Sequence, residues 1–185
     1  MKYNTDNLRI TSSAPIVTPN VLMDTYPLSA DGSSGIFQAR ETIKNILNGN
    51  DQRLMVIVGP CSIHDSKAAR DYAQKLAVLK EETKEDLFIV MRVYFEKPRT
   101  TIGWKGLIND PELNESFDID KGLKIARHLL IDLADMGMPA AVEYLDLITP
   151  QYISDLISWG AIGARTTESQ SHRELASALS CPVGF

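Results

Sequence analysis

Runs of apolar residues alternate with amphipathic stretches along most of the chain. The first two runs, Leu54–Val58 and 87–95, are apolar almost throughout, and shorter runs follow at 140–145, 161–165 and 182–185. Near-continuous apolar character, without polar alternation, is typical of strands in a parallel sheet that is covered on both faces. The pattern therefore predicts five buried parallel strands.

The segments between these runs have helical periodicity and recognisable ends. Asp65 is expected to cap one helix, and Asp120 a second helix that stops before Gly137. A third helix is expected to begin at Thr149, with a proline in its first turn, and to end before Gly160. The resulting alternation of strands and helices predicts an α/β fold and excludes all-α and all-β folds.

Two segments do not fit this repeat. Residues 1–50 contain one expected helix, at 36–47 and closed by Gly49, behind a polar lead. Such an extension is expected to pack on the outside of the domain or on a neighbouring subunit. The stretch 98–117 is too long for a simple connection, and long ordered loops at strand ends are commonly functional.

Composition limits the kind of partner. With 185 residues, 44% of them hydrophobic and 23% charged, the chain has the composition of one globular domain. A net charge of −5 argues against nucleic acid or an anionic membrane as a partner, so a small molecule is expected. The chain has no apolar run of membrane-spanning length and no secretory signal at its N-terminus, which predicts a cytoplasmic location. In that compartment Cys61 and Cys181 are expected to be free thiols or metal ligands rather than a disulfide.

One basic segment stands out in this acidic chain. The sequence RVYFEKPRTTIGWK holds one acid and four permanent cations, which are Arg92, Lys97, Arg99 and Lys105. Arginine offers a planar fork of donors that matches phosphate oxygens, and lysine adds a compact charge. A solvated loop would explain any one of these residues, but four cations in fourteen positions at a strand end favour a site for a small phosphorylated molecule.

The first strand is followed by GPCSIHD, which places a thiol where a parallel sheet presents its ligands. Cys61 is a candidate metal ligand or nucleophile, although a buried cysteine packed as a small hydrophobe is the more common case. Cys61 and His64 have ligand-like spacing, but the other histidines, His128 and His172, fall on predicted helices. A closed zinc site is therefore not expected.

Two further strand ends carry charge. Glu143 lies in an apolar strand, where it either faces a cation in the site or is a satisfied structural partner. Arg165 ends the fourth run, behind Gly163 and Ala164, which allow a ligand to approach the backbone closely. Arg165 could instead form a capping arrangement with the polar residues that follow it. Of the two roles, binding of a ligand is favoured.

Four of these motifs together resemble a known family. GPCSIHD, MRVYFEKPRTTIGWKGL, SWGAIGARTTESQ and HRELASALSCPVGF are similar to the microbial type I 3-deoxy-D-arabino-heptulosonate-7-phosphate (DAHP) synthases, which are transferases at the entry to the shikimate pathway. The resemblance implies a (β/α)8 TIM barrel, of which this chain holds about the first half, with four to five strands. Residues 1–50 would be an N-terminal helical extension with oligomer or regulatory contacts, and residues 51–185 the first half of the barrel, truncated in strand 5.

The reaction implied by the resemblance condenses phosphoenolpyruvate with D-erythrose 4-phosphate to DAHP and releases phosphate. A divalent metal (manganese, iron, cobalt or zinc) would polarise the aldehyde while C3 of phosphoenolpyruvate attacks it and water adds at C2. By position, Cys61 matches a metal ligand of the family. The positions that match substrate contacts are Arg92, Lys97 and Arg165 for the grip on phosphoenolpyruvate, Arg99 and Thr100 for the aldose phosphate, and Glu143, Gly163 and Ala164 for the lining of the phosphoenolpyruvate pocket.

The chain departs from the family pattern at Phe185, where the pattern continues into a substrate-binding lysine. A histidine, a glutamate and an aspartate that complete the metal site, and a further arginine, belong to the other half. The chain is therefore expected to be a fragment with little or no synthase activity alone. Two alternatives stay open: a non-catalytic half-barrel that binds phosphate or an aromatic amino acid, and a related enzyme such as 3-deoxy-octulosonate-8-phosphate synthase.

The resemblance also implies feedback inhibition by an aromatic amino acid, with contacts from a neighbouring subunit of a homo-oligomer. Matching positions are Asn7, Pro150, Gln151, Leu175, Leu179 and Ser180. The two leucines are four residues apart on a helix, so packing in the core is the alternative explanation for them. For Pro150 the alternative is that it only starts a helix. Phenylalanine is the preferred effector because Pro150 with Ser180 resembles that isoenzyme type. Asn7 stands where an aspartate is often found, which leaves tyrosine open.

Overall fold

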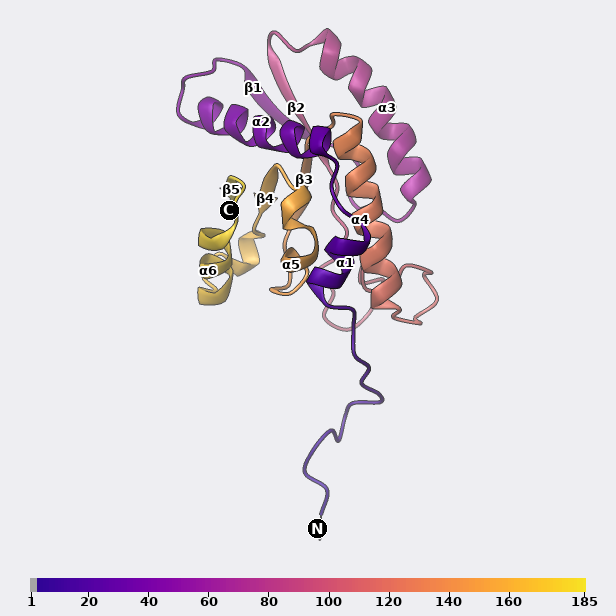
Figure 1. Cartoon of the computed structure of the whole chain (residues 1–185). Coiled ribbons are helices and arrows are strands. Elements are labelled where there is room, and N and C mark those ends of the chain that lie inside the picture. Colours follow the sequence, from indigo (N-terminus) through magenta and orange to yellow (C-terminus); the bar gives the residue numbers. More distant parts are fainter. Residues whose placement is uncertain (1–2) are drawn as a thin grey trace.

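The computed structural model describes residues 3–185 and contains one five-stranded sheet (Figure 1). The strands follow one another in the order of the sequence, and each is parallel to its neighbour. Their bounds are β1 (Leu54–Val58), β2 (Leu87–Arg92), β3 (Ala140–Glu143), β4 (Trp159–Ala161) and β5 (Val183–Gly184). All strands therefore end at the same edge of the sheet, which is where parallel α/β folds place their sites.

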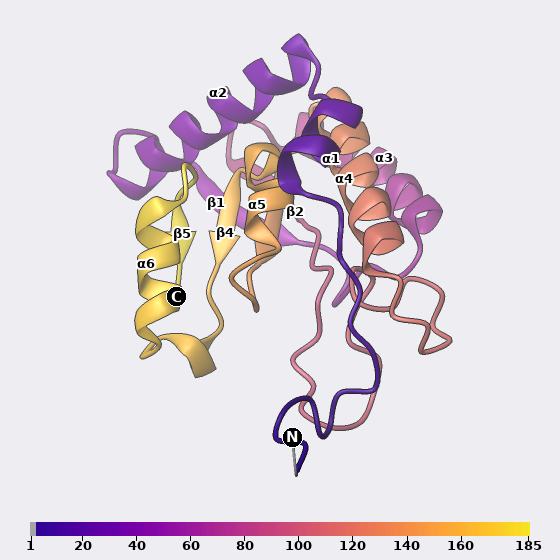
Figure 2. The same ribbon diagram turned by 60° about the horizontal axis from the view of Figure 1, so that its bottom comes forward.

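Helices connect the strands and precede the first of them. Their bounds are α1 (Pro19–Thr25), α2 (Ala30–Leu47), α3 (Ser66–Glu82), α4 (Ile119–Asp135), α5 (Pro150–Ile153) and α6 (Gln170–Ala178), with two 3₁₀ turns, η1 (Ser154–Leu156) and η2 (Ala164–Thr166). In Figure 1 α2 runs crosswise to β3 and β4, and in both views α3 lies beside α4 (Figures 1 and 2). None of the described helices is both long and apolar enough to cross a lipid bilayer.

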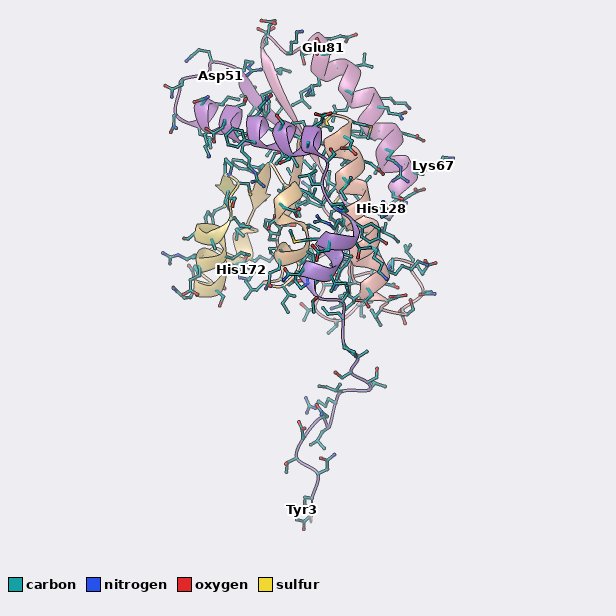
Figure 3. The ribbon with its side chains drawn as sticks, in the orientation of Figure 1. Tyr3, Asp51, Lys67, Glu81, His128 and His172 are labelled. Atoms are coloured by element: carbon teal, nitrogen blue, oxygen red, sulfur yellow. The ribbon has the colours of Figure 1, made fainter. Side chains whose placement is uncertain are left out.

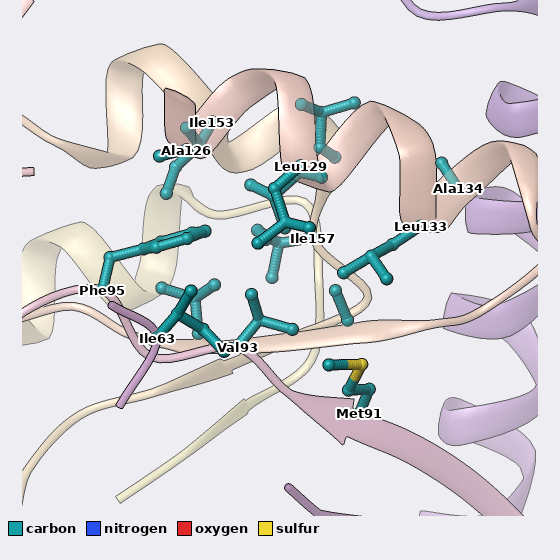
Figure 4. Packing of buried hydrophobic residues seen from close by; sticks show 14 of the residues in the cluster. Ile63, Met91, Val93, Phe95, Ala126, Leu129, Leu133, Ala134, Ile153 and Ile157 are labelled. Carbon is teal, nitrogen blue, oxygen red and sulfur yellow. The ribbon is translucent and has the colours of Figure 1, made fainter. Parts of the chain in front are cut away.

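β2 buries side chains on both of its faces. Along β2, Ile89 and Met91 join the main core, while Val90 between them joins a second cluster around Ile43 of α2. Figure 4 shows the main core, where Met91 lies opposite Leu133 of α4. Alternate side chains thus point to opposite apolar layers, which explains why the strands lack polar alternation in the sequence.

The predicted strands are confirmed with shifted ends. β1 has the predicted bounds, but β2 ends at Arg92. The Val93 N–H still donates to the Ala141 carbonyl of β3, and the Tyr94 carbonyl then accepts from the Ile63 N–H of a loop at 2.8 Å. The fourth strand was expected at 161–165 and instead covers Trp159–Ala161. Arg165 therefore does not end a strand; it lies in the 3₁₀ turn η2 that follows.

Two of the helix predictions need correction. Asp118 caps α4, by accepting from the Lys121 N–H at 3.0 Å, and Asp120 does not. Asp120 instead accepts from the Val17 N–H at 2.8 Å, a contact that no local pattern reveals. In the N-terminal extension, α2 begins at Ala30 rather than at residue 36, because Ser29 accepts from the Gly32 N–H and starts the helix earlier. The short helix α1 was missed.

The N-terminal extension is attached to the domain through α1 and α2. α1 packs against α5, and the Tyr152 hydroxyl donates to the Val17 carbonyl at 2.7 Å. The segment before it runs outward from the domain in an extended path, with Tyr3 at its end (Figure 3).

Candidate functional site

The loops after β1 and β2 bring Cys61 and Lys97 into direct contact. The Lys97 Nζ lies 2.9 Å from the Cys61 Sγ, and the Arg92 guanidinium donates to the Cys61 carbonyl at 3.3 Å. Residues from the first and second strand ends therefore share one site. The contact follows from parallel strand order, because β1 and β2 pair in register up to Val58 and Met91.

Cys61 is exposed, which rules out its packing as a small buried hydrophobe. The hydrogen bond from Lys97 and then its positive charge lower the pKa of the Cys61 thiol, and Arg92 and Arg99 act in the same direction. Cys181 is the opposite case, since it is buried and burial raises the pKa of its thiol. The surroundings of Cys61 thus favour the thiolate, the form that acts as a metal ligand or nucleophile.

Arg92 is held in place and keeps a donor free. Its guanidinium carbon lies 3.8 Å from the centre of the Tyr94 ring, and its Nε is buried without a hydrogen-bond partner. A buried donor without an acceptor is costly, and an anionic ligand would satisfy it. Gly59 makes the close strand contact possible, because a Cβ there would lie 2.6 Å from the Arg92 carbonyl oxygen.

A cavity with a volume of about 470 Å³ lies beside the cluster of Cys61, Arg92 and Lys97. Three strand ends contribute its lining, which consists of Pro98, Arg99, Thr100, Glu143, Leu145, Gly163, Ala164, Arg165 and Thr166. Arg99, Arg165 and Thr100 line the same cavity and can donate to a phosphate group, whereas the Thr166 hydroxyl already donates to the Gly163 carbonyl at 3.0 Å. Arg165 reaches it from η2, the turn after β4, rather than from the strand itself.

Gly163 lies close to the carboxyl group of Glu143 at this cavity. A Cβ at position 163 would lie 2.9 Å from the Glu143 Oε1. The carboxylate of β3 therefore fills the place that a side chain at position 163 would take. Of the two interpretations of Glu143, the structure favours the one in which it lines a cavity that also contains cations.

Lys105 does not act with the other cations. Its Nζ donates to the Arg99 carbonyl at 2.8 Å, so it fastens the loop across its own ends. The basic segment thus divides into residues that face the site and one that shapes the loop. Sequence spacing alone could not separate these roles.

The predicted effector positions lie on α5, on α6 and directly after it, and in the N-terminal segment. Pro150 and Gln151 begin α5, and Leu175 and Leu179 pack from α6 and its end against the main core. Asn7 lies in the N-terminal segment that runs outward from the domain, and it is exposed (Figure 1). This structure therefore does not bring Asn7 to the other positions.

The described residues do not form a metal centre of their own. Within residues 3–185 there is no group of three or more His, Cys, Asp and Glu side chains that could hold an ion. His128 packs edge-on against Tyr26 with the ring centres 4.5 Å apart, and His172 bonds with Ser169 and the Leu145 carbonyl. Figure 3 shows these histidines on α4 and α6, well apart. Cys61 is thus a single candidate ligand.

Glu96 and Asp146 are two further acids near the site that local sequence pattern does not reveal. Glu96 is 7% exposed and lies directly before Lys97. Asp146 accepts from the N–H groups of Ile148 and Thr149, beside the cavity. The sequence does show one signal, which is the acid Glu96 at the end of the apolar run VYFE. No local pattern indicates that Asp146 lies near it.

Comparison with known proteins agrees with this geometry. Residues 27–185 match the family described as the DAHP synthetase I family. The chain belongs to this family. A (β/α)8 barrel was expected from the resemblance, and the five parallel strands and their helices correspond to a part of such a barrel.

Curated members of the DAHP synthetase I family are similar over the whole chain. The Phe-sensitive phospho-2-dehydro-3-deoxyheptonate aldolase of Escherichia coli is 60% identical over 185 residues, which are 100% of this chain and 53% of that protein. The Trp-sensitive and Tyr-sensitive enzymes of Salmonella typhimurium are each 56% identical, over 98% and 97% of this chain and 52% and 51% of theirs. The chain thus spans about half the length of the curated relatives it matches.

A solved structure from the family has the same fold. The phospho-2-dehydro-3-deoxyheptonate aldolase of Francisella tularensis superposes with a TM-score of 0.93 and is 55% identical. The match covers 95% of this chain and 52% of that one. The arrangement of strands and helices described above is therefore that of part of a DAHP synthase.

Proposed function

We propose that this chain carries a substrate-binding part of a DAHP synthase, which joins phosphoenolpyruvate to D-erythrose 4-phosphate. The observation that supports this most strongly is the cavity that Arg99 and Arg165 line together, beside the Cys61, Lys97 and Arg92 cluster. Two phosphorylated anions need several cations in a small space, and this strand edge supplies them. The reaction forms the bond between C3 of phosphoenolpyruvate and the aldehyde carbon, adds water at C2 and releases phosphate.

The proposed roles follow from position and charge. Arg92, Lys97 and Arg165 bind phosphoenolpyruvate, and the buried Nε of Arg92 has a donor to offer. Arg99 and Thr100 bind the phosphate of the aldose. Glu143, Gly163 and Ala164 shape the pocket between them. Holding the two anions side by side lowers the entropic cost of their encounter and offsets their repulsion.

We propose Cys61 as one ligand of a divalent ion such as manganese, iron, cobalt or zinc. Its exposed thiol with lowered pKa supports this role. Within residues 3–185 no other His, Cys, Asp or Glu side chains complete a set of three around an ion. The chain alone therefore contributes a ligand rather than a centre.

Calorimetric titration of the chain with phosphoenolpyruvate, with and without manganese, tests the binding role. We expect binding that weakens at least tenfold in Arg165→Ala, because a charge-assisted hydrogen bond contributes about 1.5–3 kcal/mol. Arg70→Ala is the matched control, since Arg70 pairs with Asp132 on the helices. Equal affinities in the two variants would contradict the proposal.

A turnover assay with two aldoses separates this function from that of the related octulosonate enzyme. The chain alone is expected to have little or no synthase activity with erythrose 4-phosphate. Testing arabinose 5-phosphate in parallel addresses the related octulosonate enzyme. Binding of phosphoenolpyruvate without turnover is the result expected for the chain alone, and turnover of arabinose 5-phosphate would support the octulosonate enzyme instead.

We also propose an aromatic amino acid as effector, with phenylalanine preferred and tyrosine possible. Relatives named Phe-, Trp- and Tyr-sensitive support the class of effector. The proposed positions are Asn7, Pro150, Gln151, Leu175, Leu179 and Ser180. Titration with each of the three amino acids tests the choice, and absence of binding by all three would remove it.

Residues 1–50 are proposed to serve contacts with a neighbouring subunit of a homo-oligomer, and 51–185 to hold the substrate-binding strands. Leu8 and Ile10 are 69% and 59% exposed on the outward segment, which favours an apolar contact outside this chain. Sedimentation of the chain with and without residues 1–16 measures the contribution of this segment to association.

A further inference from the structure

Glu96 lies at the neck of the loop that carries Lys97 and Arg99. Its backbone forms an antiparallel bridge with Gly106, so residues 97–105 form a closed loop beyond it. The Lys97 N–H donates to the Lys105 carbonyl at 2.9 Å, and the Leu107 N–H donates to the Phe95 carbonyl at 2.7 Å. A group that binds the Glu96 side chain therefore also fixes the position of the base of this loop.

Asp146, after β3, is bound firmly within its own turn. Its carboxyl group accepts from the Ile148 N–H at 2.6 Å, the Thr149 N–H at 2.7 Å and the Thr149 hydroxyl at 2.6 Å. These donors lower the pKa of Asp146 against the effect of burial. Asp146 is therefore an ionised acceptor in a fixed position.

The carboxyl group of Glu96 faces that of Asp146 closely enough for the two to interact, and neither an N–H nor an O–H group of the described residues reaches the Glu96 Oε2. Two carboxyl groups can share a hydrogen bond only when one of them carries a proton. The donors around Asp146 favour its ionised form, and the Glu96 Oε2 is buried without any donor of its own. The proton consequently resides on Glu96, which then donates rather than accepts.

The surroundings of Glu96 are consistent with a neutral acid. Burial first, and then the negative charge of Asp146, raise the pKa of Glu96 to about 8, and Glu143 acts in the same direction. The Leu145 N–H opposes this shift. From α6, His172 reaches the carbonyl of Leu145 at 3.1 Å and completes the polar groups packed around this turn.

We propose that protonated Glu96 is a positioning residue, which ties the neck of loop 97–105 to Asp146 and so holds Lys97 and Arg99 at the site. The inference depends on the proposed function only for the statement that Lys97 and Arg99 of this loop bind a substrate. Deprotonation would place two carboxylates against each other in a buried position, which breaks the tie. The loop is therefore held at neutral pH and released in alkali.

Amide hydrogen exchange of residues 97–105, corrected for the intrinsic effect of pH, tests the tie between pH 6 and 9.5. In the wild-type chain we expect protection that falls as pH rises past about 8. Glu96→Gln keeps a donor at every pH, so its loop should stay protected throughout. Glu96→Ala removes the donor and should exchange about tenfold to a hundredfold faster at pH 7. Glu82→Gln, at the exposed end of α3, is the charge-matched control and should follow the wild type.

A wild-type loop whose protection is independent of pH, or a Glu96→Gln loop that opens with pH as the wild type does, would overturn the inference. If Glu96→Ala does not fold, the comparison of the wild type with Glu96→Gln decides alone. Exchange is measured without substrate, so it does not depend on the proposed function. Failure of phosphoenolpyruvate to bind the wild type would remove that function and leave the tie intact.

Discussion

At the scale of single residues, the charge of a side chain decides the chemistry of its neighbour. Lys97 contacts the Cys61 thiol at 2.9 Å and lowers its pKa. The same loop places a neutral acid, Glu96, next to that lysine. Of these two adjacent residues, Lys97 stabilises a neighbouring anion, and Glu96 has a pKa that burial raises.

Lys97→Met should make Cys61 less reactive. Without the ammonium group the thiol loses its main stabilising partner, so its pKa rises and less thiolate is present at pH 7.5. Alkylation by iodoacetamide, followed by peptide mass analysis, should slow by roughly three- to tenfold. Lys67→Met, on the exposed start of α3, is the control and should leave the rate unchanged. An unchanged rate in Lys97→Met would show that the contact does not activate the thiol.

Glu96 should also make folding stability depend on pH. Its folded pKa is raised from 4.5 to about 8, so its contribution is fully present below pH 4.5 and is lost as pH rises through 8. Asp146 has a lowered pKa, so its contribution is lost only in acid, outside this window. Relative to Glu96→Gln, the free energy of unfolding of the wild type should therefore decline between pH 5 and 8.5 in urea titrations. Parallel curves would contradict the buried proton.

At the scale of elements, one buried cation joins the N-terminal extension to the helices of the domain. Arg127 of α4 is 1% exposed and donates to the carbonyls of Tyr26 and Tyr152 at 2.9 Å. It also forms a two-pronged pair with Asp155 at 2.8 and 2.9 Å. α1, α4 and α5 are thus held by a single side chain.

Arg127→Met should destabilise the fold strongly. The change leaves Asp155 and two carbonyls without their donor, and removing one partner of a buried pair costs about 3 kcal/mol. Arg70→Met is the matched control, because the Arg70 to Asp132 pair has side chains that are 38% and 39% exposed and contributes less than about 1 kcal/mol. Urea denaturation midpoints of the two variants should differ clearly, and similar midpoints would deny Arg127 this role.

Substitution of Gly106 by alanine should destabilise the fold more than the same substitution of Gly49. Both have positive φ, at +113° and +75°, but a Cβ on Gly106 would lie 2.1 Å from the Phe95 carbonyl oxygen, while one on Gly49 would meet nothing within 4 Å. Gly49→Ala should cost about 1 kcal/mol from backbone strain alone, and Gly106→Ala more than about 2 kcal/mol. Thermal unfolding measures the loss of stability in both variants. Equal losses would contradict the close contact between position 106 and the Phe95 carbonyl.

At the scale of the whole molecule, the sheet is open. β1 and β5 lie at opposite ends of the strand order, and each pairs with one neighbour among the described strands. On β1, Leu54 is 65% exposed. An exposed apolar edge strand is a site for pairing with another chain.

Leu54→Lys should therefore reduce self-association of the chain. A charge on the edge strand opposes pairing, and the concentration at which larger species form in light scattering should rise several-fold. Leu79→Lys is the control, because Leu79 is 52% exposed but lies on α3. If both variants associate alike, the strand edge is not the contact.

The apolar pattern determined the number, order and approximate positions of the strands, because burial on both faces leaves a local signature in each run. It also placed Cys61, Lys97, Glu143 and Arg165 near one edge, since parallel strands end together. Only the tertiary structure decided that Cys61 is exposed beside Lys97, that Asp120 accepts from the Val17 N–H instead of capping a helix, and that Glu96 is buried near Asp146. Each of these depends on groups far apart in the chain, whose distances and burial are set by packing and leave no trace in local spacing.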